Sequence, residues 1–270
     1  MATISGDTSG QPRIHFRAEG SGPHVTLVHG VGADLRSWDE IACALARSFT
    51  VVRMDLLGHG SSGTIVGECT LGDLAAGVRA VWDHLEIERT HLAGFSLGGL
   101  LAQSLAISDP ERIARLAILS AVAGRTEEER AKVVDRLGLL RGKGIGAVTA
   151  AAEERWFTPK FRAQHPDRVR QRMAELLAND PVSYAAAYTV FATSDLADRL
   201  DEISHATLVA TGEHDIGSNP RMARLMHEKI RNSRLVILPG LRHSVLLEAP
   251  EQVAALLLEH FGTRRAVGTT

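Results

Sequence analysis

Residues 90–100 read Thr-His-Leu-Ala-Gly-Phe-Ser-Leu-Gly-Gly-Leu, and the serine among them is Ser96. A short apolar run, typical of a buried strand, leads into Gly-Phe-Ser-Leu-Gly, and a helix is expected to begin near the serine. Glycines on both sides of a serine let the chain reverse tightly from strand to helix and lift the hydroxyl clear of the backbone. The start of a helix also favours an anion. The pattern predicts that Ser96 is a nucleophile; the alternative is a glycine-rich turn with an incidental serine.

Similar short apolar runs alternate with helix-like segments on both sides of this turn. They occupy residues 24–29, 49–54, 90–93, 113–119, 206–210 and 234–238. Runs of this length suit strands that are buried on both faces of a parallel sheet. Residues 13–17 alternate between polar and apolar side chains and predict a half-exposed edge strand. The alternation predicts an α/β fold, with a mostly parallel central sheet flanked by helices.

One long stretch, residues 125–198, contains no convincing strand but many helix signals. A capping box begins at Thr126, and Asp180-Pro181 is a typical helix start. The stretch holds six of the twelve aromatic residues of the chain. We therefore expect an all-helical lid inserted at residues 125–198, with residues 1–124 and 199–270 forming the core.

A serine hydroxyl needs an oriented base, and after a turn of this kind the chain order is serine, acid, histidine. His243 comes just after the last predicted strand and is the expected base. Asp215 follows the strand before it and is the expected acid, with Glu213 as the alternative. Two backbone N–H groups should form the oxyanion hole. We expect them to be those of Leu97, which follows the nucleophile, and Val31, in the glycine-rich loop after an early strand.

The charge balance and cysteine content exclude several other classes of protein. Thirty Lys and Arg residues against 32 Asp and Glu give a net charge of −2, which leaves no basic field for nucleic acid. The two cysteines form no CxxC pair, as is usual in a reducing compartment. The first residues lack the features of a secretion signal, and no apolar run is long enough to span a membrane. We expect a cytoplasmic protein without a membrane or nucleic-acid partner, a metal or an organic cofactor.

Taken together, these motifs resemble those of the α/β-hydrolase superfamily over nearly the whole chain. The matching pieces are His29-Gly-Val-Gly32, Asp55-Leu-Leu-Gly-His-Gly60, Gly94-Phe-Ser-Leu-Gly98, Gly212-Glu-His-Asp215 and His243. The lid most resembles that of 3-oxoadipate enol-lactone hydrolases, through Glu154-Arg-Trp-Phe-Thr-Pro-Lys-Phe161 and Asp180-Pro-Val-Ser-Tyr184. This resemblance implies that Trp156 lies over the substrate. One departure is Leu57, which stands where relatives often have an arginine.

The resemblance implies a serine hydrolase that cleaves a small ester or lactone through an acyl-enzyme, with 3-oxoadipate enol-lactone as the expected substrate in aromatic-acid catabolism. A general carboxylesterase, a C–C hydrolase of vinylogous diketones and a small-molecule receptor with slow hydrolysis remain alternatives. Tyr188 is a second expected pocket residue. A substrate carboxylate would need a cation. The sequence does not choose among the candidates, nor between a monomer and a homodimer. The candidate cations are Arg136, Arg141, Lys143, Arg155, Lys160 and Arg162.

Overall fold

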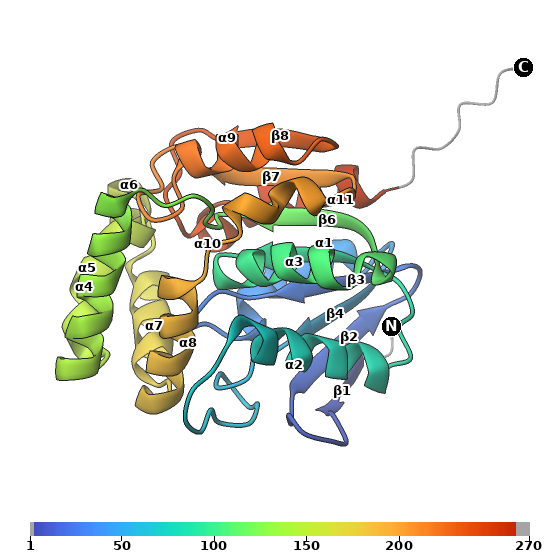
Figure 1. Cartoon of the computed structure of the whole chain (residues 1–270), viewed down its shortest axis with the longest axis horizontal. Helices are drawn as coiled ribbons and strands as arrows, with labels where there is room; N and C mark the ends of the chain where they lie inside the picture. The colour runs from blue at the N-terminus through green and yellow to red at the C-terminus, as the bar shows by residue number, and fades with distance from the viewer. Residues whose placement is uncertain (1–2, 263–270) are drawn as a thin grey trace, which may run out of the picture.

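The computed structural model describes residues 3–262, which fold around one eight-stranded sheet with the strand order β1-β2-β4-β3-β5-β6-β7-β8 (Figure 1). Strands β3 to β8 run parallel to one another, whereas β2 is antiparallel to both β1 and β4. The strands are β1 (Thr3–Asp7), β2 (His15–Gly20), β3 (His24–Val28), β4 (Thr50–Met54), β5 (Thr90–Phe95), β6 (Ile113–Leu119), β7 (Thr207–Gly212) and β8 (Ser233–Leu238).

Helices cover both faces of the sheet and enclose a separate apolar core on each. One core gathers side chains of α2, α3 and α9 around Trp82, whose indole N–H donates to Thr26 Oγ1 at 2.9 Å. The other gathers side chains of α1 and α11 around Trp38. These helices, with the short α10, are α1 (Asp39–Leu45), α2 (Leu71–His84), α3 (Leu97–Ser108), α9 (Pro220–Lys229), α10 (Val245–Glu248) and α11 (Pro250–Phe261). The predicted fold class, a mostly parallel sheet flanked by helices, is confirmed.

The prediction of an edge strand at residues 13–17 was wrong. Strand β2 begins at His15 and pairs with β4 on one side, while β1 covers its other side and forms the edge of the sheet. Along β2 buried and more exposed side chains alternate because only one face of the strand packs on the core. Polar alternation therefore reports the two faces of a strand, not whether its backbone edges are paired.

Between β6 and β7 the chain forms only helices, which stand together at one side of the sheet in Figure 1. We call this segment, from Glu127 to Thr193, the lid; the predicted domain boundaries at residues 125 and 198 stay a prediction. Its helices are α4 (Glu127–Lys143), α5 (Gly146–Trp156), α6 (Pro159–Gln164), α7 (Pro166–Leu177) and α8 (Pro181–Thr193). As expected, α4 starts at a capping box on Thr126, and α8 starts after Asp180.

Two charged side chains tie the ends of the lid to each other. The buried Arg125 donates to the backbone carbonyls of Phe191, Ala192 and Ser194, and its guanidinium lies 4.7 Å from the centre of the Phe191 ring. Asp195 accepts hydrogen bonds from the backbone N–H groups of Gly124 and Arg125. The entry and exit of the lid are thus held together where it meets the core.

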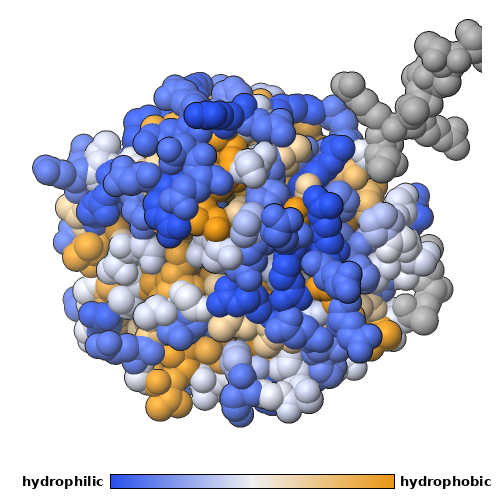
Figure 2. Space-filling view, turned by 45° about the vertical axis from the view of Figure 1, so that its right-hand side comes forward, coloured by the Kyte–Doolittle hydropathy of each residue, from blue (hydrophilic) through white to orange (hydrophobic). Residues whose placement is uncertain are grey.

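Among the described residues no helix is both long and apolar enough to cross a bilayer. The face of the molecule in Figure 2 carries hydrophilic side chains over much of its area, with smaller apolar patches between them.

The turn between β5 and α3 is the most crowded part of the sheet. Ser96 adopts φ 55° and ψ −115°, a conformation that residues with a side chain rarely take. A Cβ on Gly94 would lie 2.0 Å from the carbonyl oxygen of Gly98, and one on Gly98 would lie 2.2 Å from that of Val28. The glycines are therefore required by contact with backbone atoms, which cannot move aside as side chains can.

This crowding makes a prediction about stability. Gly98→Ala should lower the free energy of unfolding by about 3 kcal/mol or more, because the added methyl group meets a backbone carbonyl. Gly138→Ala, in the middle of α4 with nothing within 4 Å of its Cβ position, should raise it by about 0.5–1 kcal/mol through helix propensity. Urea unfolding of both variants measures the difference. A Gly98→Ala protein as stable as the parent would contradict this close approach of the two backbone segments.

Candidate active site

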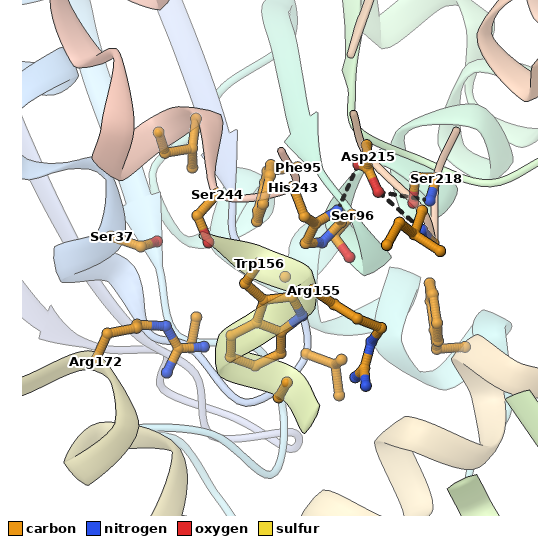
Figure 3. A pocket seen from close by; sticks show the side chains of 18 of the residues that line it. Ser37, Phe95, Ser96, Arg155, Trp156, Arg172, Asp215, Ser218, His243 and Ser244 are labelled. Atoms are coloured by element: carbon orange, nitrogen blue, oxygen red, sulfur yellow. Dashed lines mark hydrogen bonds and ion pairs between the residues drawn. The ribbon is translucent and has the colours of Figure 1, made fainter. Parts of the chain in front are cut away.

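Three side chains from separate loops meet beyond the carboxyl ends of the parallel strands (Figure 3). Ser96 follows β5, Asp215 follows β7 and His243 follows β8. His243 Nδ1 lies 2.7 Å from Asp215 Oδ2, and the His243 ring packs beside the ring of Phe95, with their centres 5.0 Å apart. The Ser96 hydroxyl lies next to the His243 ring in Figure 3 and makes no hydrogen bond to a described residue.

The buried carboxylate of Asp215 is held in one orientation. Its Oδ1 accepts hydrogen bonds of 2.9 Å from the backbone N–H groups of Gly217 and Ser218. Its Oδ2 faces His243, which assigns the proton of the neutral imidazole to Nδ1 and leaves Nε2 as an acceptor. The alternative acid, Glu213, is half exposed and accepts from the Gly240 N–H at 2.8 Å instead. Asp215 is therefore the carboxylate that orients His243.

Two backbone N–H groups lie on either side of Ser96 in the chain path. Leu97 begins α3, and Val31 belongs to the loop after β3. That loop approaches the nucleophile closely, because a Cβ on Gly30 would lie 3.0 Å from Ser96 Cβ. Neither the Val31 nor the Leu97 N–H donates to an acceptor in the part of the chain that the structure describes. Both are thus available to hold an oxyanion.

Two buried histidines support this loop from behind. His29 Nδ1 lies 2.8 Å from the Gly30 carbonyl oxygen, and its Nε2 accepts from the Leu56 N–H at 2.9 Å. His59 Nε2 accepts from the Gly32 N–H at 3.0 Å. Each ring therefore needs an unprotonated Nε2 to keep its hydrogen bond. Both histidines lie within motifs that the sequence shows, but their role in holding the loop was not expected from it.

The electrostatics of the two histidines agree with these hydrogen bonds. Burial lowers the pKa of His59 from 6.5 to about 3, with the charge of His29 as a smaller cause. Burial lowers the pKa of His29 to about 4. Both rings are consequently neutral near pH 7. Asp55, in the same motif as His59, accepts from the backbone N–H groups of Leu35 and Ser61 at 2.8 Å, so this motif stabilises the loops around the site.

A cavity of about 780 Å³ opens between the lid and the carboxyl ends of the strands. Ser96, Asp215 and His243 line it, and so do the expected pocket residues Trp156 and Tyr188. Tyr188 accepts a hydrogen bond of 3.1 Å at its hydroxyl from Arg136 Nε. Leu57 packs against the core and is absent from the residues lining the cavity.

The lid cations divide into two groups. Of the six candidates, only Arg136 and Arg155 line the cavity, whereas Arg141, Lys143, Lys160 and Arg162 do not. Arg172 also lines it, with its guanidinium 5.1 Å from the centre of the Trp156 ring, and was not among the candidates expected from the sequence. No periodic signal could have found it, because its place depends on how α7 packs against α5. Among residues 3–262 no group of three or more His, Cys, Asp or Glu side chains has metal-ligand geometry.

Comparisons with known proteins agree with this architecture. A model of the alpha/beta hydrolase family matches residues 27–256. The chain is 29% identical over 229 residues to a 3-oxoadipate enol-lactonase from Acinetobacter baylyi, covering 85% of each chain. It is 28% identical over 242 residues to (E)-2-((N-methylformamido)methylene)succinate hydrolase from the same organism, covering 88% of this chain and 90% of that one. The solved structure of the enol-lactonase from Burkholderia xenovorans LB400 aligns with a TM-score of 0.89 at 27% identity, over 96% of this chain and all of that one. The predicted resemblance is confirmed.

The neutral histidines predict a dependence of stability on pH. Between pH 6.5 and about 3 the unfolded chain binds a proton at His59 that the folded chain does not, so stability falls as pH falls. Each such histidine contributes a slope of about 1.4 kcal/mol per pH unit in that window. His59→Gln keeps an acceptor for the Gly32 N–H but cannot titrate. Its free energy of unfolding should therefore fall less steeply from pH 6 to pH 4 than that of the parent, by up to about this slope.

Urea unfolding at pH 7, 6, 5 and 4 measures both slopes. Equal slopes for the parent and His59→Gln would show that His59 is not held neutral in the folded protein.

Proposed function

This chain belongs to the alpha/beta hydrolase family, and on that basis we propose that it is a serine hydrolase that cleaves a small carboxylic ester or lactone through an acyl-enzyme. One observation carries the proposal: the oriented pair of Asp215 and His243 lies beside Ser96 in the wall of a cavity. A nucleophile, a base and an orienting acid are the minimum set for acyl transfer without an added nucleophile.

In the first half of the reaction Ser96 Oγ attacks the carbonyl carbon, and His243 Nε2 takes the hydroxyl proton. Asp215 stabilises the imidazolium that forms. The Val31 and Leu97 N–H groups hold the developing oxyanion, with each donor worth about 3 kcal/mol in comparable sites. The hydrogen bond between Ser96 and His243 would form in the substrate complex, as such contacts tighten there.

In the second half the tetrahedral intermediate collapses and expels an alkoxide or enolate, which takes its proton from His243. A water molecule, deprotonated by the same imidazole, then attacks the acyl-enzyme and releases the acid and Ser96. For a lactone the leaving oxygen stays tethered to the acyl chain, so hydrolysis gives one product. An enol leaving group tautomerises to a ketone, which makes ring opening effectively irreversible.

The best-supported substrate is 3-oxoadipate enol-lactone. Two observations support it: similarity to enol-lactonases along most of the chain, and a lid tryptophan, Trp156, in the cavity wall. A general carboxylesterase is the second candidate, because about 780 Å³ has room for a larger acyl group than this lactone. C–C hydrolysis and a receptor with slow hydrolysis stay as outcomes of the test. A cytoplasmic location stays a prediction.

The proposal predicts that Ser96→Ala abolishes turnover. Loss of the ultraviolet absorbance of freshly made 3-oxoadipate enol-lactone should slow by at least about 10³-fold, and so should release of nitrophenolate from short 4-nitrophenyl esters. Asp215→Asn should lower kcat by about 10²- to 10⁴-fold, because the imidazole loses its orienting acceptor. Ser104→Ala is the matched control: it removes a hydroxyl about two turns further along α3 and should keep the parent's activity.

The outcomes separate the candidates. Serine-dependent decay of the enol-lactone with kcat/KM of about 10⁵ M⁻¹s⁻¹ or more supports a lactonase. Turnover of the nitrophenyl esters alone supports a carboxylesterase, and a single turnover supports a receptor. Unchanged turnover by Ser96→Ala on every ester would contradict the mechanism.

A further inference from the structure

Arg172 is an unusual side chain within the active-site cavity. It lies on α7, and its guanidinium packs over the indole of Trp156, 5.1 Å from the ring centre. Its Nη1 is buried and has no hydrogen-bond partner among the described residues. An arginine has only donors to offer, so this nitrogen faces the cavity region without an acceptor.

The other cations that line the cavity all have acceptors from the protein. Arg36 pairs with Asp34, Lys132 with Glu128, and Arg168 with Glu40. Backbone carbonyls accept from Arg125 and from Arg155, whose acceptor is the Ala151 oxygen at 2.9 Å. Arg136 donates to the hydroxyl of Tyr188. Within residues 3–262, Arg172 is thus the lining cation whose charge no hydrogen bond or ion pair engages.

The carboxylates that line the cavity are engaged elsewhere as well. Glu175, one turn after Arg172 on the same helix, accepts from Gln171 Nε2 at 3.2 Å. The remaining carboxylates of the lining bond to other groups: Asp39 to Arg53, Glu40 to Arg168, Glu128 to Lys132, Glu129 to Arg221 and Asp215 to His243. No lining carboxylate forms an ion pair with Arg172 in the described part of the chain.

The surroundings of Arg172 favour an anionic acceptor. Burial lowers the pKa of its guanidinium, and the charge of Glu175 only partly offsets this. A charged donor that has left water without gaining an acceptor is destabilised, and an acceptor brought by a ligand removes that penalty. The indole of Trp156 fixes the plane of the guanidinium, whose paired N–H groups match the two oxygens of a carboxylate.

Two hydroxyl groups lie on the same side of Trp156 as Arg172 in Figure 3, whereas Arg155 lies on the other side. They belong to Ser37 and to Ser244, the residue that follows His243. The Ser37 hydroxyl donates to the Asp34 carbonyl oxygen at 2.8 Å. The Ser244 hydroxyl makes no hydrogen bond to a described residue, so it is free to donate to a second acceptor in this part of the cavity.

We propose that Arg172 is the binding site for a substrate carboxylate, so that the protein selects esters or lactones whose chain ends in a carboxylate. The proposal rests on the proposed function of Ser96 and deepens it, because it assigns the recognition of the acid group to one residue. It does not depend on the enol-lactone itself. Any small ester or lactone with a carboxylate at the right distance from its reacting carbonyl would fit.

The test compares two esters that differ only in charge. A mono-4-nitrophenyl ester of a linear dicarboxylic acid is an anion, and its methyl-capped form is neutral and nearly the same shape. We expect kcat/KM of the parent protein to favour the anion by about 10-fold or more at one chain length in the series glutarate, adipate and pimelate. Ser96→Ala gives the background rate.

Substitution then assigns the preference to the residue. Arg172→Gln should lower the ratio of anionic to neutral kcat/KM by about 10- to 100-fold, and Arg172→Lys should restore part of it through its charge alone. Arg170→Gln is the matched control: it removes the same charge two residues away on α7, where the side chain is exposed and bonded to Asp167. It should keep the parent's ratio.

A binding measurement keeps the inference separate from catalysis. In Ser96→Ala, adipate should change the fluorescence of Trp156 in a saturable way, whereas Trp38 and Trp82 are fully buried in the two cores of the sheet. Adding Arg172→Gln should weaken the apparent affinity by about 10-fold or more, and adding Arg170→Gln should not.

Each result has one meaning. If the parent hydrolyses the neutral ester as fast as the anion at every chain length, the Arg172 proposal is overturned while the serine mechanism stands. If neither ester is hydrolysed, the proposed function fails, and the adipate titration alone decides whether Arg172 binds a carboxylate. Equal ratios and equal affinities in the Arg172→Gln and Arg170→Gln proteins would also overturn it, and this comparison is internal to each folded variant.

Discussion

The close approach of three backbone segments around Ser96 is the constraint on which the rest of the structure depends. Gly94 touches the turn of α3, Gly98 touches the end of β3, and Gly30 brings the next loop against the serine. The same contacts hold Ser96 at positive φ and point its hydroxyl toward the cavity. Because strands β5, β7 and β8 are parallel, the residues that follow them gather at one edge of the sheet, and Asp215 and His243 meet there.

Core and lid contribute different parts of the chemistry. The loops of the core carry the nucleophile, the base, the acid and the N–H groups of Val31 and Leu97, and the neutral rings of His29 and His59 hold the loop that bears one of these donors. The lid supplies Trp156, Tyr188 and most of the positive charge that lines the cavity. A core of this kind can act on many esters, so selection among substrates falls mainly to lid residues such as Arg172.

Much of the fold and the proposed triad could be predicted because their signals are local. The glycines around Ser96, the capping box at Thr126 and the prolines that begin α8, α9 and α11 each act within a few residues. The features that sequence reasoning missed depend on distant partners. The edge position belongs to β1 because of pairing along β2, and the roles of His59 and Arg172 arise from contacts with Gly32 and Trp156, which lie elsewhere in the chain. Neither contact leaves a periodic or compositional trace.

The central claim is that Ser96 forms a covalent acyl intermediate. The most direct measurement mixes the protein with 4-nitrophenyl acetate, quenches the reaction in acid within milliseconds and locates the acetyl group by mass spectrometry of peptides. We expect a burst of nitrophenolate close to one equivalent and an acetyl group on the hydroxyl of Ser96, with neither in Ser96→Ala. Steady turnover with no acetylated serine, or with the acetyl group on another residue, would contradict it.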